Sequence, residues 1–255
     1  MKLFYRSFGS GSPLLILHGL FGQSDNWNTL AKQFASEGLQ VFTADLRNHG
    51  LSPHSGEWSY AAMTEDILEL INDLNLSQLS VLGHSMGGRV AMQFAIRYPE
   101  RIHKLIIADM APKTYPSHHD QIVKGLLSAD LTLLKTRKEV DARLSEYISD
   151  EATKQFLLKN LYWIQEDRLG WRFNLPVIAS RLSEVSSPFP VPDQPCTVPA
   201  WFIRGGRSGY VTEADMPLIQ TIFPKAVLVT IPDAGHWIHA EQPRIFKEEV
   251  IRILA

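Results

Sequence analysis

The chain has 255 residues, 45% of them hydrophobic, which is enough to bury the core of one or two domains. Its 25 Lys and Arg residues nearly balance its 27 Asp and Glu residues, so the net charge of −2 gives no general attraction to nucleic acid or to anionic membranes. The single cysteine, Cys196, excludes an intramolecular disulfide and a cysteine-rich zinc site, and it fits a reducing compartment.

The first half of the chain alternates between short apolar runs and amphipathic segments. The apolar runs predict strands at 2–8, 13–18, 41–45, 79–84 and 104–109. Hydrophobic residues spaced three and four apart predict helices at 26–37, 64–74 and 86–97. This alternation implies a mostly parallel sheet with helices on both faces. Right-handed crossovers then place the carboxyl ends of the strands along one edge, where we expect the functional residues.

The pattern changes after Pro112. From 113 to 185 no convincing buried strand is found, and helices are predicted at 119–129, 137–149, 151–161 and 174–185. A proline-rich stretch follows, and strands resume at 200–204 and 226–231, with helices at 213–223 and from 243. We therefore expect an α/β core of about seven strands, formed by residues 1–112 and 191–255, with a helical cap inserted at 113–190.

A short motif, Gly83-His84-Ser85-Met86-Gly87, lies where a predicted strand ends and a predicted helix begins. It matches G-x-S-x-G, in which a tight turn lifts the serine hydroxyl above the sheet edge. Glycines flank the serine because a Cβ there would collide with the neighbouring strand or helix, and the helix N-terminus favours negative charge at the site. The motif in this context indicates a nucleophile elbow, with Ser85 as the nucleophile, rather than an ordinary strand–helix turn.

Four motifs, in this order along the chain, resemble those of the α/β-hydrolase family: His18-Gly19-Leu20-Phe21-Gly22, Asp45-x-Arg47-x-x-Gly50-x-Ser52, Gly83-His84-Ser85-Met86-Gly87-Gly88 and Gly235-His236. The resemblance extends over essentially the whole chain. In particular, the chain resembles small bacterial esterases akin to mitochondrial abhydrolase-domain proteins with the His-Gly-Leu-Phe-Gly motif. The resemblance implies an α/β-hydrolase fold and a catalytic serine, histidine and acid.

A serine nucleophile needs a base to take its proton, and nine histidines compete for this role. His236 follows the last predicted strand, in a loop that can reach across the sheet edge to Ser85, and its position agrees with that of the family's histidine. We therefore expect His236 to be the base. His18 is expected to hold the loop that follows its strand, and His84 to pack under the elbow. The others are expected at the surface or in packing roles, and one near the cap could touch substrate: His49, His54, His103, His118, His119 and His239.

The acid departs from the commoner family pattern. In most of the family it follows the penultimate strand, but that position is Ser208 here, and serine lacks the charge that stabilises an imidazolium. Asp109 ends the strand that follows the nucleophile helix. This position is about one strand spacing (~4.8 Å) nearer the serine than the usual position of the acid. A subset of the family places its acid there. We expect Asp109 to be the acid. The alternatives are Glu213 and Asp215, which are expected to cap the next helix. Asp233 is a further alternative, but it lies three residues before His236 in the same loop and is badly placed to support the imidazole ring.

Ester hydrolysis also requires donors for the oxyanion of the tetrahedral intermediate. The amide of Met86, directly after the nucleophile, is one expected donor, and the amide of Leu20 is the other. Gly19 and Gly22 would allow that backbone to approach the substrate carbonyl. The alternative is a plain strand–helix loop.

Several side chains are candidates for the substrate pocket: Phe21, Arg89, Trp163, Tyr210 and Trp237. Arg89, after the double glycine of the elbow helix, is either a buried ion-pair partner or a carboxylate binder. The aromatic residues of the cap either line an apolar acyl pocket or form the core of the cap. A cap rich in aromatic residues and leucine favours medium or long acyl groups.

The sequence thus predicts a serine hydrolase that cleaves carboxylic esters or thioesters, with acyl-CoA as one candidate, through an acyl-enzyme. Two alternatives stay open. A lyase of the same fold would use the serine–histidine pair as a base without acylation, and Gly87-Gly88-Arg89 resembles such enzymes of menaquinone synthesis. A non-catalytic ligand receptor is the other alternative, because a fold does not determine function.

The expected partner is a small-molecule acyl ester or thioester. The sequence contains no metal-ligand spacing and no phosphate-cradling loop, so neither a metal nor a cofactor is expected. No apolar run reaches the ~18 residues of a membrane span, and the first residues are too polar for a signal-peptide core. We expect a cytoplasmic protein, a monomer, without nucleic-acid binding and without stable membrane insertion.

Overall fold

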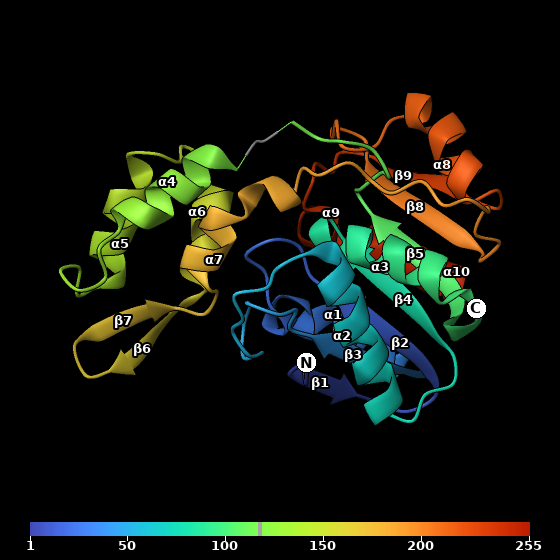
Figure 1. Ribbon diagram of the computed structural model, residues 1–255, viewed down its shortest axis with the longest axis horizontal. Coiled ribbons are helices and arrows are strands. Elements are labelled where there is room, and N and C mark those ends of the chain that lie inside the picture. The colour runs from blue at the N-terminus through green and yellow to red at the C-terminus, as the bar shows by residue number, and fades with distance from the viewer. Residues whose placement is uncertain (117–118) are drawn as a thin grey trace.

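A seven-stranded sheet runs through the computed structural model, which describes residues 1–116 and 119–255 (Figure 1). The strands lie in the order β1-β3-β2-β4-β5-β8-β9, and all neighbouring pairs are parallel except β1 and β3. Their bounds are Tyr5–Phe8 (β1), Ser12–Leu17 (β2), Leu39–Ala44 (β3), Leu79–His84 (β4), Ile102–Ala108 (β5), Ala200–Gly205 (β8) and Val227–Ile231 (β9). The predicted, mostly parallel sheet of about seven strands is confirmed.

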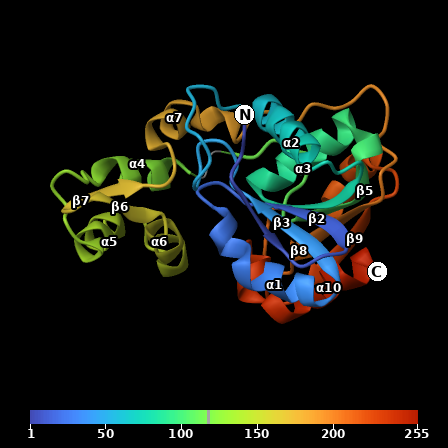
Figure 2. The ribbon, with the colours of Figure 1, turned by 90° about the horizontal axis from the view of Figure 1, so that it is seen from below.

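Helices cover both faces of this sheet (Figure 2). Their bounds are Asn28–Ser36 (α1), Tyr60–Asp73 (α2), Met86–Arg97 (α3), Met216–Ile222 (α8), Ile238–Glu241 (α9) and Pro243–Leu254 (α10), with 3-10 helices at Ser24–Trp27, Pro99–Arg101 and Glu213–Asp215. Along β2, Leu15 and Leu17 belong to the buried cluster that includes residues of α2, α3 and α8, whereas Leu14 and Ile16 belong to the cluster that includes residues of α1 and α10. Because both faces are buried, the strands read as continuous apolar runs in the sequence. In the part of the chain described, no helix is long and apolar enough to cross a membrane.

The cap elements lie between β5 and β8 in the sequence and to one side of the sheet in Figure 1. They are Asp120–Ser128 (α4), Arg137–Ser145 (α5), Glu151–Leu158 (α6), Leu161–Gln165 (β6), Arg168–Trp171 (β7), Leu175–Ser180 (α7) and a 3-10 helix at Leu182–Glu184. The four predicted helices are present in shorter form. We keep 113–190 as the proposed extent of the cap; Ser117 and His118 within it lie outside the described residues.

The antiparallel hairpin β6–β7 corrects the expectation of an all-helical cap. The helix predicted at 151–161 ends at Leu158, and β6 begins at Leu161. Leu161 is buried, but the following residues of β6 are half-buried or exposed. The strand therefore lacks the buried pattern by which strands are recognised in a sequence.

The turn between β4 and α3 holds Ser85 at φ 52° and ψ −119°, a backbone conformation that few residues other than glycine adopt. Holding such a residue costs about 1–3 kcal/mol, which the surroundings must supply. They do so by close packing, because a Cβ on Gly83 would overlap the carbonyl oxygen of Gly87, and a Cβ on Gly87 would overlap that of Leu17. The expected reason for the flanking glycines, collision with the neighbouring strand or helix, is thus confirmed.

We predict that Gly87→Ala destabilises the protein by about 1–3 kcal/mol, because the new methyl group pushes α3 away from β2. Urea denaturation followed by circular dichroism measures the change. Gly56→Ala is the matched control, since no atom lies within 4 Å of the position its Cβ would take. A Gly87→Ala protein as stable as Gly56→Ala would contradict this account of the elbow.

Candidate active site

Three side chains form a continuous hydrogen-bonded line at the carboxyl edge of the sheet. Ser85 lies between β4 and α3, Asp109 directly follows β5, and His236 lies in the loop after β9. The Nε2 atom of His236 is 3.1 Å from Ser85 Oγ, and its Nδ1 atom is 2.8 Å from Asp109 Oδ2. The structure therefore brings together the three residues expected to be nucleophile, base and acid.

The carboxylate of Asp109 is completely buried and held by hydrogen bonds from three directions. Ser208 Oγ donates to Oδ2, the oxygen that also contacts His236. The amide of Gly205 donates to Oδ1 at 3.3 Å. A buried carboxylate needs such donors to offset the loss of water. Ser208, at the position where most of the family was expected to carry its acid, thus contacts the acid supplied by the neighbouring strand.

The competing carboxylates have other partners. Asp215 pairs with Lys113 at 2.8 Å and accepts a hydrogen bond from the amide of Thr212, so it caps the 3-10 helix Glu213–Asp215 as expected. The side chain of Glu213 is 82% exposed and pairs with Arg204 at 3.0 Å. Neither is among the hydrogen-bond partners that the described residues provide to His236.

The ring and loop of His236 are braced by three neighbours that the sequence did not reveal in this role. The ring of Tyr210 stacks on the imidazole, with 3.9 Å between centroids. His84 Nε2 lies 2.9 Å from the carbonyl oxygen of His236, and Glu241 accepts hydrogen bonds from the amides on both sides of it. His84 does lie under the elbow as expected, but it also contacts the base's loop. A sequence pattern does not reveal such contacts. His84 and His236, for example, are about 150 residues apart in the sequence.

The loop after β2 presents its backbone to the same site. No hydrogen bond within the described part of the chain is donated by the amide of Leu20 or of Met86. His18 holds this loop, because its Nδ1 is 2.8 Å from the carbonyl oxygen of Gly19 and its Nε2 accepts from the amide of Leu46 at 3.0 Å. Asn160, from the cap, donates to the carbonyl oxygen of Phe21 at 2.9 Å. The two amides expected to bind the oxyanion thus have no acceptor among the described residues, and their role as oxyanion donors stays a prediction.

Three other histidines near the site, His18, His84 and His239, are buried. Burial lowers the pKa of His18 to about 4 and that of His239 to about 3, and it lowers the pKa of His84 well below its ordinary value. His236 differs from them because its side chain is 20% exposed and contacts a carboxylate. It alone of these four has the geometry of a proton acceptor for Ser85.

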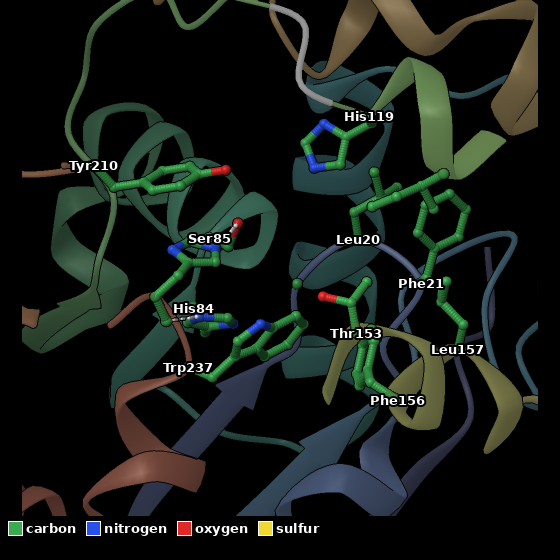
Figure 3. A pocket seen from close by; sticks show the side chains of 13 residues that line it. Leu20, Phe21, His84, Ser85, His119, Thr153, Phe156, Leu157, Tyr210 and Trp237 are labelled. Carbon is green, nitrogen blue, oxygen red and sulfur yellow. Dashed lines mark hydrogen bonds between the residues drawn. The ribbon is translucent and has the colours of Figure 1, made fainter. Parts of the chain in front are cut away.

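A cavity of about 230 Å³ opens above Ser85 (Figure 3). Of the expected pocket residues, Phe21, Tyr210 and Trp237 line it, together with Leu20 of the expected oxyanion loop. The cap supplies His119, Ile122, Thr153, Phe156 and Leu157. His119 agrees with the expectation that a histidine near the cap could touch substrate, whereas the other four were not expected. In Figure 3 the last three of these cap residues come from one helix, α6, and the ring of Phe156 packs against that of Trp237, with 4.4 Å between centroids.

The structure does not place Trp163 and Arg89 in this cavity. Trp163 is 57% exposed on the hairpin strand β6, so the expectation that it lines the pocket is wrong. Arg89 is completely buried and donates to the carbonyl oxygens of Val185 and Ser187. Its guanidinium also lies over the rings of Tyr60 and Phe189, at 4.8 and 5.7 Å from their centroids. Among the described residues, Arg89 has no carboxylate partner, so neither of its two expected roles is observed. Instead it holds the segment that returns from the cap.

Residues 12–158 match the model of the α/β hydrolase fold family. The chain belongs to this family. It is 36% identical over 253 residues to sn-1-specific diacylglycerol lipase ABHD11 of Danio rerio, which covers 96% of this chain and 79% of that protein. It is 33% identical over 246 residues to Esterase YbfF of Escherichia coli strain K12, which covers 96% of this chain and 94% of that protein. Among solved structures, a marine microorganism esterase superimposes with a TM-score of 0.96 at 43% identity and 99% coverage of both chains.

These findings confirm the resemblance drawn from the four sequence motifs. The relatives are named as esterases and lipases. In this chain the residue at the elbow of the α/β-hydrolase fold is a serine, Ser85. In the described residues, no group of three or more His, Cys, Asp or Glu side chains could hold a metal ion.

The buried histidines predict a loss of stability in mild acid. Burial holds the pKa of His18 near 4 and those of His49 and His239 near 3, whereas the unfolded chain has ordinary values near 6.5. Between about pH 6.5 and pH 4 the unfolded state therefore binds more protons than the folded state, so the free energy of unfolding falls as the pH falls, by up to ~1.4 kcal/mol per pH unit for each histidine. Scanning calorimetry at pH 7, 6 and 5 measures this slope.

One variant isolates the contribution of a single histidine. His239→Phe removes a titratable ring but keeps an aromatic ring against Trp27, on which His239 stacks at 4.2 Å. We expect a shallower slope for His239→Phe and an unchanged slope for His103→Gln, which replaces an exposed histidine. Equal melting temperatures of the wild type at pH 7 and pH 5 would refute the prediction.

Proposed function

We propose that this α/β-hydrolase cleaves carboxylic esters through an acyl-enzyme, with Ser85 as nucleophile, His236 as base and Asp109 as acid. The observation that carries the proposal is the hydrogen-bonded line from Asp109 through His236 to Ser85 at the base of a cavity. The names of the relatives, esterase and lipase, support the same reaction class.

The first half of the reaction acylates the serine. With its Nδ1–H donated to Asp109, His236 presents the lone pair of Nε2 to the Ser85 hydroxyl. Ser85 Oγ attacks the ester carbonyl carbon while its proton passes to Nε2, and the carboxylate stabilises the imidazolium that forms. The carbonyl oxygen becomes an oxyanion that accepts hydrogen bonds from the amides of Leu20 and Met86. The bond from carbon to the leaving oxygen then breaks, and that oxygen takes the proton from Nε2.

The second half returns the enzyme to its starting state. Water attacks the acyl carbon while His236 accepts a proton from it, and the same two amides stabilise the second oxyanion. The bond from carbon to Ser85 Oγ breaks, Oγ regains its proton from His236, and the carboxylic acid leaves. Every step uses groups of this chain, the substrate and water.

We extend the proposal to thioesters, including acyl-CoA. A thiolate is a better leaving group than an alkoxide, so the same nucleophile, base and oxyanion donors suffice for both. The expected partner remains a small-molecule ester or thioester.

The burial of Arg89 argues against the lyase alternative, in which Gly87-Gly88-Arg89 resembles such enzymes and Arg89 would bind an anionic substrate. The guanidinium donates to backbone carbonyl groups outside the cavity. A non-catalytic receptor would not need a base and an acid aligned on the serine, and this alignment favours an enzyme.

We predict that Ser85→Ala abolishes ester turnover while it leaves the melting temperature close to that of the wild type, because it removes only the nucleophile. Hydrolysis of p-nitrophenyl acetate by the purified variant, corrected for the uncatalysed rate, measures the loss. Residual turnover near the wild-type rate would show that another residue attacks the ester.

The acid is tested by Asp109→Asn, which keeps the shape of the side chain but favours the wrong histidine tautomer. We expect kcat to fall by up to ~10⁴-fold, as in the serine-protease case, with a much smaller change in KM. Asp215→Asn is the control and is expected to leave kcat almost unchanged, because Asp215 pairs with Lys113. The assignment is wrong if Asp109→Asn keeps most activity while Asp215→Asn or a Glu213 variant loses it.

Ser208 is expected to act through the acid, as a positioning residue. Ser208→Ala removes the hydroxyl that donates to Asp109 Oδ2, and hydrogen bonds to charged groups contribute roughly 1.5–3 kcal/mol. We therefore expect kcat to fall about 10- to 100-fold with little change in KM, and Ser208→Thr, which keeps a hydroxyl, to retain more activity. Equal rates for Ser208→Ala and the wild type would show that this contact does not support catalysis.

A further inference from the structure

We infer that this hydrolase prefers short acyl groups, acetyl or propionyl, joined to a larger alcohol or thiol. The inference rests on the proposed ester hydrolysis and names its substrate class. Two compartments of very different size meet at Ser85. One, of about 230 Å³, is lined by His236 and the cap helix α6; the other, of about 20 Å³, is lined by Met110, Val185 and Tyr210.

The chemistry of the reaction assigns each compartment to one part of the substrate. When the tetrahedral intermediate collapses, the leaving oxygen must receive a proton from His236 Nε2. The alcohol or thiol therefore extends into the compartment that His236 lines, which is the larger one. The oxyanion faces the amides of Leu20 and Met86, so the acyl chain takes the remaining direction, into the smaller compartment. His236 does not belong to the lining of that compartment among the described residues.

The smaller compartment is just large enough for one or two carbon atoms beyond the carbonyl. A cavity needs at least about 10–15 Å³ to hold one water-sized group, and this one has about 20 Å³. A methyl or ethyl group fits such a space. A longer chain would have to displace the walls, and forcing extra methylene groups into a packed interior costs about 1–3 kcal/mol.

One wall is the segment that returns from the cap, which contributes Val185 and Ser186. Arg89 fixes it by donating to the carbonyl oxygen of Val185 at 3.1 Å and to that of Ser187 at 2.6 Å. The hydroxyl of Tyr60 also donates to the carbonyl oxygen of Val185, at 3.3 Å. Because Arg89 is fully buried, moving this wall outward would strand a charged group without its partners.

The opposite wall is fixed by a tyrosine from the start of the cap. The hydroxyl of Tyr115 accepts a hydrogen bond from the amide of Ala111 at 2.8 Å and donates to the carbonyl oxygen of Tyr210 at 2.7 Å. The rings of Tyr115 and Tyr210 also stack, 5.2 Å apart. Met110, which directly follows the proposed acid, is 4% exposed and belongs to the same lining. Both walls are thus held by hydrogen bonds rather than by apolar contact alone.

This inference reverses the expectation of medium or long acyl groups drawn from the composition of the cap. Many of the apolar cap residues, such as Leu126, Val140, Leu144 and Leu158, are almost completely buried in the core. Others, such as Trp163 and Leu133, are exposed to solvent. A count of apolar residues therefore does not measure the space beside the nucleophile.

The test is the acyl-length profile of the purified protein. We expect kcat/KM for p-nitrophenyl esters to be highest for acetate or propionate and to fall at least about tenfold by hexanoate, in line with the 10- to 200-fold discrimination per methylene seen in apolar pockets. Met110→Ala and, independently, Val185→Ala enlarge the smaller compartment. Each is expected to raise the ratio of kcat/KM for hexanoate over acetate at least about tenfold.

Phe156→Ala is the matched control, because it removes a large side chain from the other compartment. It is expected to leave the hexanoate-to-acetate ratio unchanged while it alters discrimination between p-nitrophenyl and naphthyl acetates. Melting curves of each variant separate effects on the pocket from loss of the fold. Should Met110→Ala not fold, the wild-type profile and Val185→Ala decide the question.

The possible failures are distinguishable. A wild-type enzyme that hydrolyses octanoate as fast as acetate would overturn the inference and leave ester hydrolysis standing. A change of the acyl ratio in Phe156→Ala, with none in Met110→Ala or Val185→Ala, would show that the acyl chain occupies the larger compartment. A protein that hydrolyses no ester and whose Ser85 does not react with a fluorophosphonate would overturn the proposed function itself.

Discussion

The hydrogen bond between the carboxylate of Asp109 and the ring of His236 is the contact on which the rest of the site depends. It joins the end of β5 to a loop that begins two strands away, after β9, and it orients the imidazole toward Ser85. A buried carboxylate is stable only with donors around it. Gly205, the last residue of the intervening strand β8, and Ser208, in the loop that follows it, provide them. Three neighbouring strand ends thus converge on one carboxylate, and this convergence lets the proposed acid stand one strand nearer the nucleophile.

The backbone around the site is held in conformations that would be unfavourable elsewhere. Phe21, Ser85 and Asp109 all have positive φ, at 58°, 52° and 50°. They stand, respectively, in the oxyanion loop, at the elbow and at the acid. Such conformations cost about 1–3 kcal/mol each and persist only where packing over-determines them. Here three features supply that constraint: the close contact between Gly83 and Gly87 beneath the elbow, the hydrogen bond from Asn160 to the carbonyl oxygen of Phe21, and the buried strand ends.

The parts of the molecule that could be predicted from the sequence are those where burial dictates residue type. The strands are covered on both faces, so runs such as 13–18 and 79–84 could be located, and the glycines at 83 and 87 mark a turn that tolerates no Cβ. Asp109 could be inferred because Ser208 left the usual position without a charge. The hairpin β6–β7 could not be predicted, because most of it is exposed. The position of Arg89 and the sizes of the two compartments depend on contacts between residues about 100 positions apart, which no local pattern encodes. The exposure of Trp163 follows from its place on the hairpin that the sequence did not predict.

In the proposed mechanism Ser85 carries the acyl group during turnover. The acyl-enzyme can be trapped by mixing the enzyme with p-nitrophenyl acetate, quenching in acid within the first turnovers, and mapping the acetylated peptide by mass spectrometry. We expect one acetyl group per protein molecule, on the peptide that contains Ser85. Acetylation of a different residue, or rapid turnover by a protein that is never acetylated under conditions where hydrolysis of the acyl-enzyme is slowed, would contradict the proposed mechanism.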